Sequence, residues 1–228
     1  KIFDSYLNES IIRRAIKSGK IKINIVNLRD FATGKHKTAR PTERYQSFGR
    51  VDDSPYGGGA GMVLMAEPIL KAVNKVIDKN KSQKTKIVVL SAKGKQFNQK
   101  IAYNWSKKFN KIVLVSGRYE GIDERAIKAL NVEEISIGPY ILTDGDVAAM
   151  VLISAVARLI PGVIKFESLK EESHWNLLQK KGESENLEYP HYTRPEVFVY
   201  KGKKYAAPKI LLSGNHEKIE KWRKIHRK

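Results

Sequence analysis

Residues 111–146 read KIVLVSGRYEGIDERAIKALNVEEISIGPYILTDGD, and two short runs rich in Ile and Val stand out in them. These runs, 111–116 and 133–137, have the length and the β-branched composition of strands. Between them, residues 122–130 have the apolar spacing of a surface helix. A strand, a helix and a second strand in this order are typical of a parallel sheet, because parallel strands need a crossover connection.

The same alternation extends in both directions from this stretch. Residues 147–160 are apolar nearly all round, which predicts a buried helix. Upstream, the patterns predict strands at 22–27 and 86–90 and helices at 3–18, 67–79 and 97–109. We therefore expect an α/β domain over 1–162, in which helices cover a parallel sheet.

Three loops of this domain should open on one rim. They follow the predicted strands and span 90–94, 116–125 and 136–146. Ligands of open α/β sheets bind outside the carboxyl ends of the strands. Gly138 and Gly145 would let the backbone approach a flat ligand closely. Each loop alone is explained by a plain strand-to-helix turn, but the three together favour a pocket.

The charge of the chain favours a polyanionic partner. Lys and Arg number 43 against 24 Asp and Glu, a formal net charge of +19. Nucleic acid and an anionic membrane surface both fit this charge. A membrane span is not expected, because no apolar stretch reaches the roughly 20 residues that a bilayer requires. There is no cysteine, and nothing at the start of the chain reads as a signal peptide, so a cytoplasmic protein is expected.

The chain changes character after Pro161. Residues 163–188 carry six Glu against four Lys and show no sustained period, which predicts a flexible linker. Residues 189–228 hold eleven Lys and Arg against three Glu. They predict a small basic domain, whose last helix begins after Asn215 and presents Ile219, Trp222, Ile225 and His226 on one face.

Six segments, in order, carry a resemblance to a known family. They are PYGGGAGM at 55–62, GRYEGIDER at 117–125, ISIGPYIL at 135–142, ARLIPGV at 157–163, LEYPHYTRPE at 187–196 and LLSGNHEKIEKWR at 211–223. Together they resemble the bacterial tRNA (guanine-N1)-methyltransferases of the SPOUT superfamily. The resemblance covers nearly the whole chain, and it also implies a first strand ahead of Lys1.

The resemblance implies a fold, a reaction and partners. The fold would be a trefoil-knotted α/β domain with helices on both faces of its sheet, followed by a small, mainly helical domain that binds tRNA. The reaction would move a methyl group from S-adenosyl-L-methionine to N1 of the guanine immediately 3′ of the anticodon. The protein would be a homodimer with its active site at the subunit interface. The family's activity is also associated with Mg²⁺, although no acidic cluster marks a site in this sequence.

The resemblance also implies site residues. Glu188 stands where the family has a catalytic Asp and would act as general base, and Arg158 would stabilise the charge that develops on guanine O6. The cofactor-binding residues would be Leu90, Ser91, Gly94, Gly117, Glu120, Ile137, Gly138, Pro139, Tyr140, Ile141, Leu142 and Gly145. The substrate-binding residues would be Tyr56, Gly58, Gly59, His191 and Arg194.

Departures from the family pattern keep two alternatives open. Pro139 removes a backbone donor, and Asp144 places a side chain where the family often has glycine. A non-catalytic RNA-binding protein with a degenerate pocket would explain both substitutions. A SPOUT ribose 2′-O-methyltransferase would share the cofactor loops but would need neither Glu188 nor the last domain. No structural metal is expected from the spacing of the histidines, and residues 39–50 read as an exposed insertion.

Overall fold

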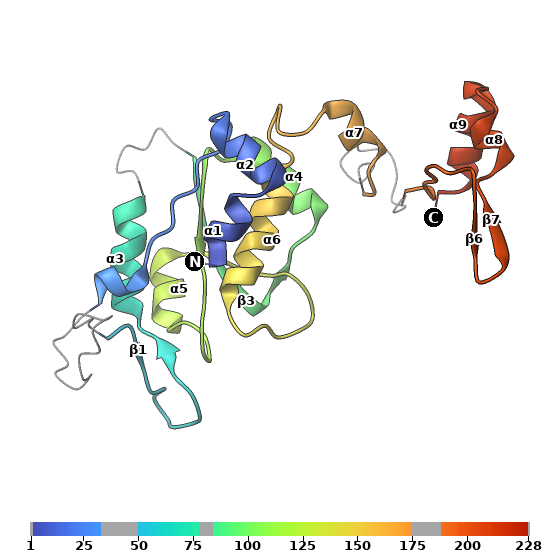
Figure 1. Cartoon of the computed structure of the whole chain (residues 1–228). Coiled ribbons are helices and arrows are strands. Elements are labelled where there is room, and N and C mark those ends of the chain that lie inside the picture. The colour runs from blue at the N-terminus through green and yellow to red at the C-terminus, as the bar shows by residue number, and fades with distance from the viewer. Residues whose placement is uncertain (1, 33–49, 78–83, 175–187, 228) are drawn as a thin grey trace. The chain divides into compact units, whose positions relative to one another are not determined.

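The computed structural model describes residues 2–32, 50–77, 84–174 and 188–227 (Figure 1). The chain divides into two compact units, Lys1–Ile164 and Lys165–Lys228, and each is described here by itself. The predicted insertion at 39–50 lies outside the described residues, apart from Arg50. In the described parts of the chain, no helix is both long and apolar enough to cross a membrane.

A three-stranded parallel sheet forms the centre of the first unit. Its strands are β3 (Thr85–Gln96), β4 (Lys111–Val115) and β5 (Glu133–Ser136), in the order β4-β3-β5. Val88 pairs with Leu114 on one side and with Glu133 on the other. Parallel strands buried on both faces read as continuous apolar runs. This explains why the Ile and Val runs predicted the sheet correctly.

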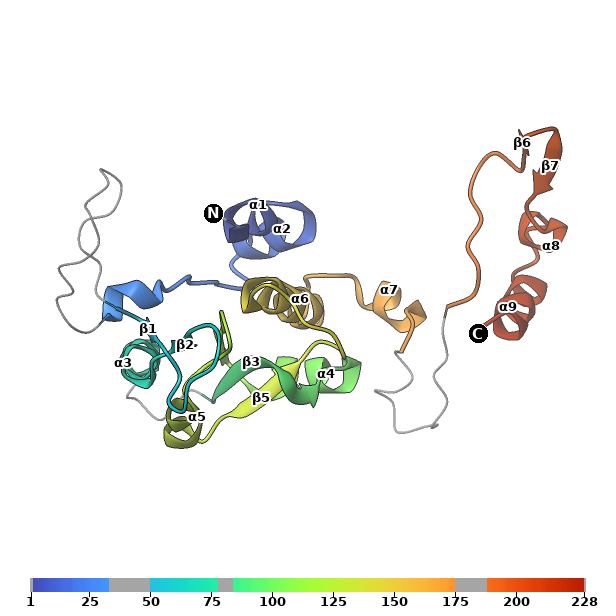
Figure 2. The same cartoon turned by 90° about the horizontal axis from the view of Figure 1, so that it is seen from below.

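Helices cover both faces of this sheet, as the sequence predicted (Figure 2). On one face, Val88 and Ile135 pack with α4 (Gln99–Lys108) and α6 (Gly145–Ala157). On the other, Ile87 and Val115 pack with α3 (Ala66–Val76) and α5 (Glu124–Leu130). The central strand β3 therefore contributes side chains to both apolar cores, and the sheet supports the loops at its carboxyl edge.

Strand β3 is longer than predicted, and this corrects the first of the three loops. Residues 90–94 were expected to turn from strand into helix, but the strand runs on to Gln96. Ile135 is the register partner of both Leu90 and Lys95, so residues 91–94 bulge out between them. A bulge re-aims side chains without ending the strand, which is why its sequence resembles a turn.

The N-terminal segment differs from its prediction in two ways. The helix expected at 3–18 is two helices, α1 (Ile2–Leu7) and α2 (Ser10–Lys17). The chain breaks where Asn8 Nδ2 donates to the Asp4 carbonyl at 2.7 Å and Ser10 takes a φ of +43°. The strand predicted at 22–27 was wrong: no described strand pairs with it, and it leads into the 3₁₀ turn η1 (Leu28–Phe31).

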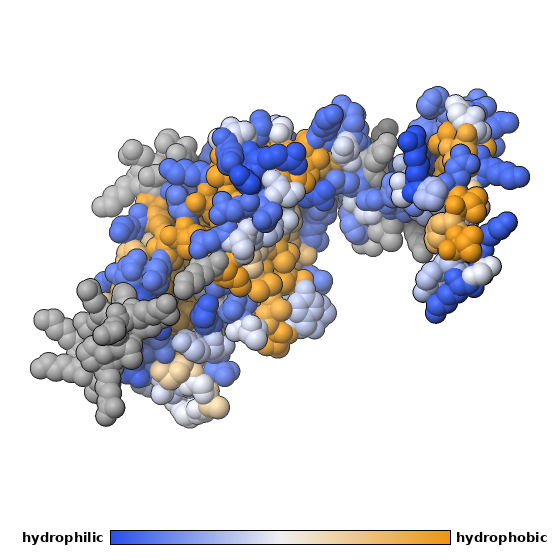
Figure 3. Space-filling model, viewed as in Figure 1, coloured by the Kyte–Doolittle hydropathy of each residue, from blue (hydrophilic) through white to orange (hydrophobic). Residues whose placement is uncertain are grey.

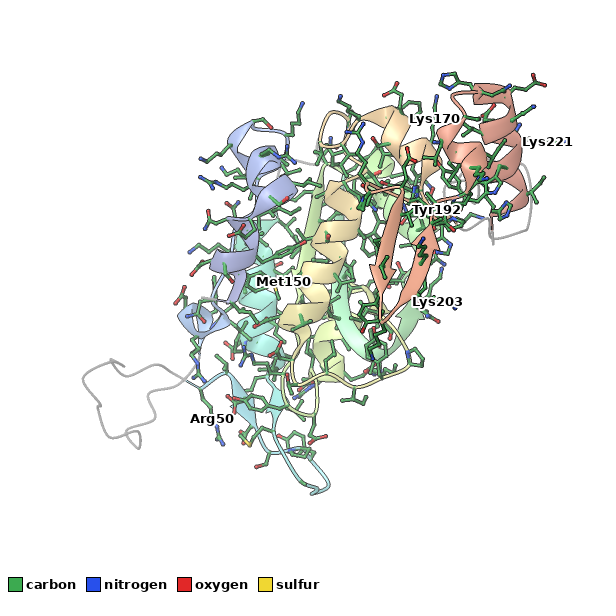
Figure 4. The ribbon with its side chains drawn as sticks, turned by 45° about the vertical axis from the view of Figure 1, so that its right-hand side comes forward. Arg50, Met150, Lys170, Tyr192, Lys203 and Lys221 are labelled. Atoms are coloured by element: carbon green, nitrogen blue, oxygen red, sulfur yellow. The ribbon has the colours of Figure 1, made fainter. Side chains whose placement is uncertain are left out.

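Helix α6 is less buried than its composition predicted. Ala148, Ala149 and Leu152 face the core, whereas Val147 and Val151 are 38% and 42% exposed. Figure 3 shows apolar side chains gathered over this helix, and Figure 4 marks the helix with Met150. The helix therefore presents apolar side chains to solvent as well as to the core.

The second unit contains more β structure than expected. A short helix, α7 (Phe166–Glu171), lies inside the predicted linker. Strands β6 (Val197–Tyr200) and β7 (Lys203–Ala206) form an antiparallel hairpin, which the expectation of a mainly helical domain had missed. Helices α8 (Lys209–Leu212) and α9 (His216–Ile225) follow. Gly202 at the hairpin turn has a φ of +74°, so the Lys-Gly pair was the available turn signal.

Helix α9 begins where it was predicted to begin. The side chain of Asn215 accepts a hydrogen bond from the Lys218 backbone N–H at 3.1 Å and so caps the helix. Trp222 stacks on His226 with ring centroids 4.1 Å apart and meets Tyr192 edge-on at 6.2 Å. Ile225, which was predicted to share a face with Trp222, is 68% exposed.

Candidate active site

The end of β4 and the start of α6 bring two of the predicted cofactor residues, Gly117 and Gly145, against a third, Leu90 of β3. The Gly145 backbone N–H donates to the Gly117 carbonyl oxygen at 2.8 Å. A Cβ on Gly117 would lie 3.5 Å from the carbonyl oxygen of Leu90. The structure therefore places residues from the end of β4 and the start of α6 against β3 on one rim, as the loop pattern predicted.

Two glycines at this rim are required by close backbone packing. A Cβ on Gly145 would lie 2.9 Å from the Gly117 nitrogen and 2.9 Å from the Ser116 hydroxyl oxygen. A Cβ on Gly94 would lie 2.5 Å from the Glu134 carbonyl carbon. Because both obstacles include backbone atoms, no rotamer change relieves them. These glycines let backbone segments pack closely on one another, and for Gly145 this is a reason other than the approach of a flat ligand that the sequence suggested.

The loop that leaves β5 exposes apolar side chains. Tyr140, Ile141 and Leu142 are 53%, 82% and 38% exposed. Ser136, which is buried, anchors the loop: its hydroxyl donates to the Gly138 carbonyl at 2.9 Å and accepts from the Gly138 N–H at 3.2 Å. An anchored loop with outward apolar groups can receive an aromatic or apolar ligand. Ile137 and Pro139 lie in the same loop, and Pro139 is exposed.

Asp144 and Asp146 have structural roles that the sequence did not reveal. Asp144 caps α6, since its side chain accepts from the Asp146 N–H at 2.8 Å. Asp146 accepts from the Ser116 hydroxyl at 2.6 Å and from Arg118 Nη2 at 2.9 Å. The contact with Asp146 also raises the pKa of Arg118. The Asp-Gly-Asp spacing of an N-cap with a first-turn acid was the available signal for this arrangement.

We expect Asp146→Asn to lower the free energy of unfolding by about 1–2 kcal/mol, because a charge-assisted hydrogen bond to Ser116 is lost. The Arg118 contribution is small, since its side chain is 55% exposed. Asp144→Asn is the matched control, because Asn caps helices as well as Asp does. Chemical denaturation of both variants measures the difference, and equal stabilities would contradict the assigned roles.

A glycine-rich loop lies directly beside the loop after β4. It is carried by the short strands β1 (Asp52–Asp53) and β2 (Val63–Leu64). The Glu120 N–H donates to the Met62 carbonyl at 3.0 Å, and the Leu64 N–H donates to the Gly121 carbonyl at 2.9 Å. The predicted substrate loop is therefore anchored to a predicted cofactor loop.

The tip of this loop is open. Tyr56 is 96% exposed, and Gly58 and Gly59 have φ values of +80° and +121° that L side chains rarely adopt. A Cβ on Gly61 would come within 2.5 Å of the Glu120 carboxylate. The backbone and the Tyr56 ring of this loop are therefore accessible to a large ligand.

The two predicted catalytic residues lie in different units. Arg158 is the C-cap residue of α6, and its backbone N–H donates to the Ser154 carbonyl at 3.4 Å. Glu188 belongs to the second unit. The surroundings of Arg158 and of Glu188 are therefore described separately, each within its own unit.

Glu188 is held by groups that the sequence did not identify. Its carboxylate accepts from the Ser173 N–H at 3.0 Å and lies 3.3 Å from His191 Nε2, while its own N–H donates to the Ser173 hydroxyl at 3.1 Å. These contacts, the Ser173 N–H first and His191 next, lower the pKa of Glu188. The carboxylate is therefore ionised at neutral pH.

His191 and Arg194 lie on the exposed surface of the second unit. His191 contacts Glu188 and packs against the Tyr189 ring with centroids 4.7 Å apart. Arg194 lines a shallow hollow of about 340 Å³ together with Tyr192, Leu211 and Leu212. Arg223 lies over the same Tyr189 ring, with its guanidinium 4.9 Å from the ring centre. The two predicted substrate residues thus belong to one aromatic and basic surface.

In the described ranges, no group of three or more His, Cys, Asp or Glu side chains could hold a metal ion. The carboxylates at the rim are already engaged: Asp146 with Ser116 and Arg118, and Asp123 with Arg125.

Known proteins resemble this chain over nearly its whole length. The sequence model of the family described as "tRNA (Guanine-1)-methyltransferase TrmD" matches residues 1–228. A tRNA (guanine-N(1)-)-methyltransferase of Carboxydothermus hydrogenoformans is 48% identical over 225 residues, which are 98% of this chain and 78% of the relative.

Two further relatives carry the same name. The protein of Thermomicrobium roseum is 46% identical over 98% of this chain and 74% of its own length. That of Clostridioides difficile is 44% identical over 98% of this chain and 87% of its own length. The resemblance found in the six sequence segments is confirmed, and the chain belongs to the tRNA (guanine-N1)-methyltransferase family.

Proposed function

We propose that this protein transfers a methyl group from S-adenosyl-L-methionine to N1 of the guanine immediately 3′ of the anticodon of tRNA. The observation that carries the proposal is the rim at which Leu90, Gly117 and Gly145 meet, together with the anchored, apolar loop that leaves β5. This rim lies at the carboxyl edge of a parallel sheet, where ligands of such folds bind. The net charge of +19 fits an RNA substrate.

The residues of the rim fit S-adenosylmethionine. Its adenine could lie against the exposed side chains of the loop 137–142, and backbone groups near Gly117 and Glu120 could read its polar edge. Proline at 139 removes one main-chain N–H but leaves the other main-chain groups of the loop available to the cofactor, and the Asp144 side chain is occupied in capping α6. When bound, the cofactor supplies an electrophilic methyl group on sulfur.

Glu188 and Arg158 would act on the guanine. N1 of guanine carries a proton and is a poor nucleophile, so a nearby carboxylate that accepts this proton accelerates the reaction by about 10²- to 10⁴-fold. The lowered pKa of Glu188 keeps it in the accepting form. Negative charge then develops on O6, and the Arg158 guanidinium could donate hydrogen bonds to it.

We further propose a homodimer whose active site is completed across the subunit interface. Support comes from Val147 and Val151, the exposed apolar side chains on α6, since apolar patches of this kind mark protein contacts. A dimer would allow Arg158 of one subunit to meet Glu188 of the other. The trefoil knot of the SPOUT superfamily is proposed on family membership alone.

Methylation of an unfractionated tRNA pool with labelled S-adenosylmethionine, followed by nucleoside analysis, tests the reaction. We expect 1-methylguanosine as the labelled product. A labelled 2′-O-methylnucleoside would instead establish the ribose methyltransferase alternative. Calorimetry with S-adenosylmethionine tests the non-catalytic alternative, because a chain that does not bind this cofactor cannot have the proposed activity.

A further inference from the structure

The β6–β7 hairpin is exposed along its whole length. Every residue from Val197 to Ala206 is exposed, and Phe198, Val199 and Tyr200 reach 54%, 61% and 57%. An isolated two-stranded hairpin is marginally stable in water, and a contiguous apolar surface usually has a partner. The apolar side chains of the hairpin are visible at the surface in Figure 3.

The two faces of this hairpin differ in chemistry. The register places Phe198 opposite Tyr205 and Tyr200 opposite Lys203, while the intervening pairs are Val197 with Ala206 and Val199 with Lys204. Since side chains alternate along a strand, the first two pairs share one face. We call Phe198, Tyr200, Lys203 and Tyr205 the aromatic face. The opposite face is mainly aliphatic and provides an internal control.

The aromatic face offers flat rings together with positive charge. The Phe198 and Tyr205 rings are stacked, with centroids 5.3 Å apart and planes at 14°. Lys203 Nζ lies 5.5 Å from the Tyr205 ring centre, and Lys201 Nζ lies 5.5 Å from that of Tyr200. Lys203 is marked on β7 in Figure 4. Residues 197–206 contain three lysines and no acidic residue.

These features select one class of partner. Rings that present their π-faces among lysines bind unpaired nucleotides, because bases stack on the rings while the lysines contact phosphates. An apolar protein segment would need the rings but would leave the three lysines without anionic partners. A double helix would need the lysines but would offer no free base face. An unpaired RNA segment uses both groups.

We propose that the aromatic face stacks an unpaired base of the tRNA substrate, with Lys201 and Lys203 contacting the phosphates beside this base and Lys204, which belongs to the opposite face, contacting a phosphate farther along the same RNA segment. This inference rests on the proposed tRNA substrate and specifies how the second unit grips it. Stacking tolerates any base, so the face would add affinity without selecting a sequence. Discrimination of the target guanine would remain with the active site.

Three variants of the full chain test the proposal: Phe198→Ala/Tyr205→Ala on the aromatic face, Val197→Ala/Val199→Ala on the aliphatic face, and Lys201→Gln/Lys203→Gln/Lys204→Gln. Fluorescence anisotropy with labelled tRNA at several salt concentrations gives Kd. We expect the ring variant to weaken binding roughly 5- to 100-fold, as loss of base stacking does, with little change in salt dependence. The valine variant should bind normally, and Tyr205→Phe should retain binding.

The lysine variant keeps the rings in place. It therefore tests the proposal even if the ring variant misfolds. It should bind tRNA more weakly and flatten the plot of log K against log salt by up to about 2 units, because each phosphate contact contributes about 0.7. Unchanged Kd in the ring variant, or equal losses in the ring and valine variants, would overturn the proposal. Loss of dimerisation with intact tRNA binding would assign the face to a protein contact and would also overturn it.

Failure of this proposal is distinguishable from failure of the proposed function. The hairpin variants should bind S-adenosylmethionine with unchanged affinity in calorimetry, and saturating tRNA should restore their kcat. If the wild-type chain binds tRNA through the aromatic face but forms no 1-methylguanosine, the stacking surface stands and the methyl transfer does not.

Discussion

Glu188→Gln is expected to lower kcat by about 10²- to 10⁴-fold, because the amide has no lone pair basic enough to take the N1 proton of guanine. Affinity for S-adenosylmethionine should remain nearly unchanged, since the rim that would bind it lies in the other unit. Single-turnover methylation of tRNA measures the chemical step directly. Glu188→Asp should retain part of the activity, as it keeps the carboxylate and shortens its reach by one methylene.

Two further carboxylates provide matched controls for this experiment. Glu183 and Glu185 stand in the same acidic stretch of sequence, so Glu183→Gln and Glu185→Gln change the same charge by the same amount. A large loss of kcat in either control with normal turnover in Glu188→Gln would transfer the role of general base to that residue. A normal kcat in all three variants would exclude these carboxylates as the general base.

The pH dependence of the wild-type enzyme adds an independent check on Glu188. Its pKa is lowered below the ordinary value of about 4.3 by the Ser173 N–H and by His191. The contacts therefore contribute stability above that value, which is lost as the pH falls through the lowered pKa. If these contacts persist in the complex, the kcat/KM profile should show no acid limb from Glu188 between pH 5 and 8.

The sequence predicted the sheet of the first unit well because its strands are buried on both faces. A run such as 86–90 has one explanation, since β-branched residues of that density are rare in loops. Prediction failed where the local sequence pattern indicates an element but the fold supplies no matching partner for it. Residues 22–27 alternate like a strand but pair with no strand among the described residues, and the bulge at 91–94 has the sequence of a turn.

The residues of the candidate site could be predicted from the sequence only where they belong to a motif of the family. The glycines could be identified from sequence, but the reason for Gly94 and Gly145 is contact with distant backbone. The network of Asp146 with Ser116 and Arg118 joins residues 28 and 30 positions apart, and the contact of Glu188 with Ser173 spans 15. The fold brings these partners together, and no local sequence pattern identifies them.

Arg158→Ala is the second variant with a large expected effect. Loss of a donor to the charge that develops on O6 should lower kcat by about 10²- to 10³-fold, the usual consequence of removing such a group. Arg158→Lys should recover only part of the rate, because lysine keeps the charge but not the paired donors of the guanidinium.

Mixing the two inactive variants then tests whether the site is shared. If Arg158 of one subunit works with Glu188 of the other, a heterodimer of Arg158→Ala and Glu188→Gln chains holds one doubly altered site and one intact site. Random exchange makes half of the dimers mixed, so the mixture should regain about one quarter of wild-type activity. Sites confined within one chain would each carry one lesion and regain nothing. Differently tagged subunits, purified as the mixed dimer, make the comparison quantitative: half of wild-type activity per dimer supports the shared site, and inactivity of that purified heterodimer contradicts it.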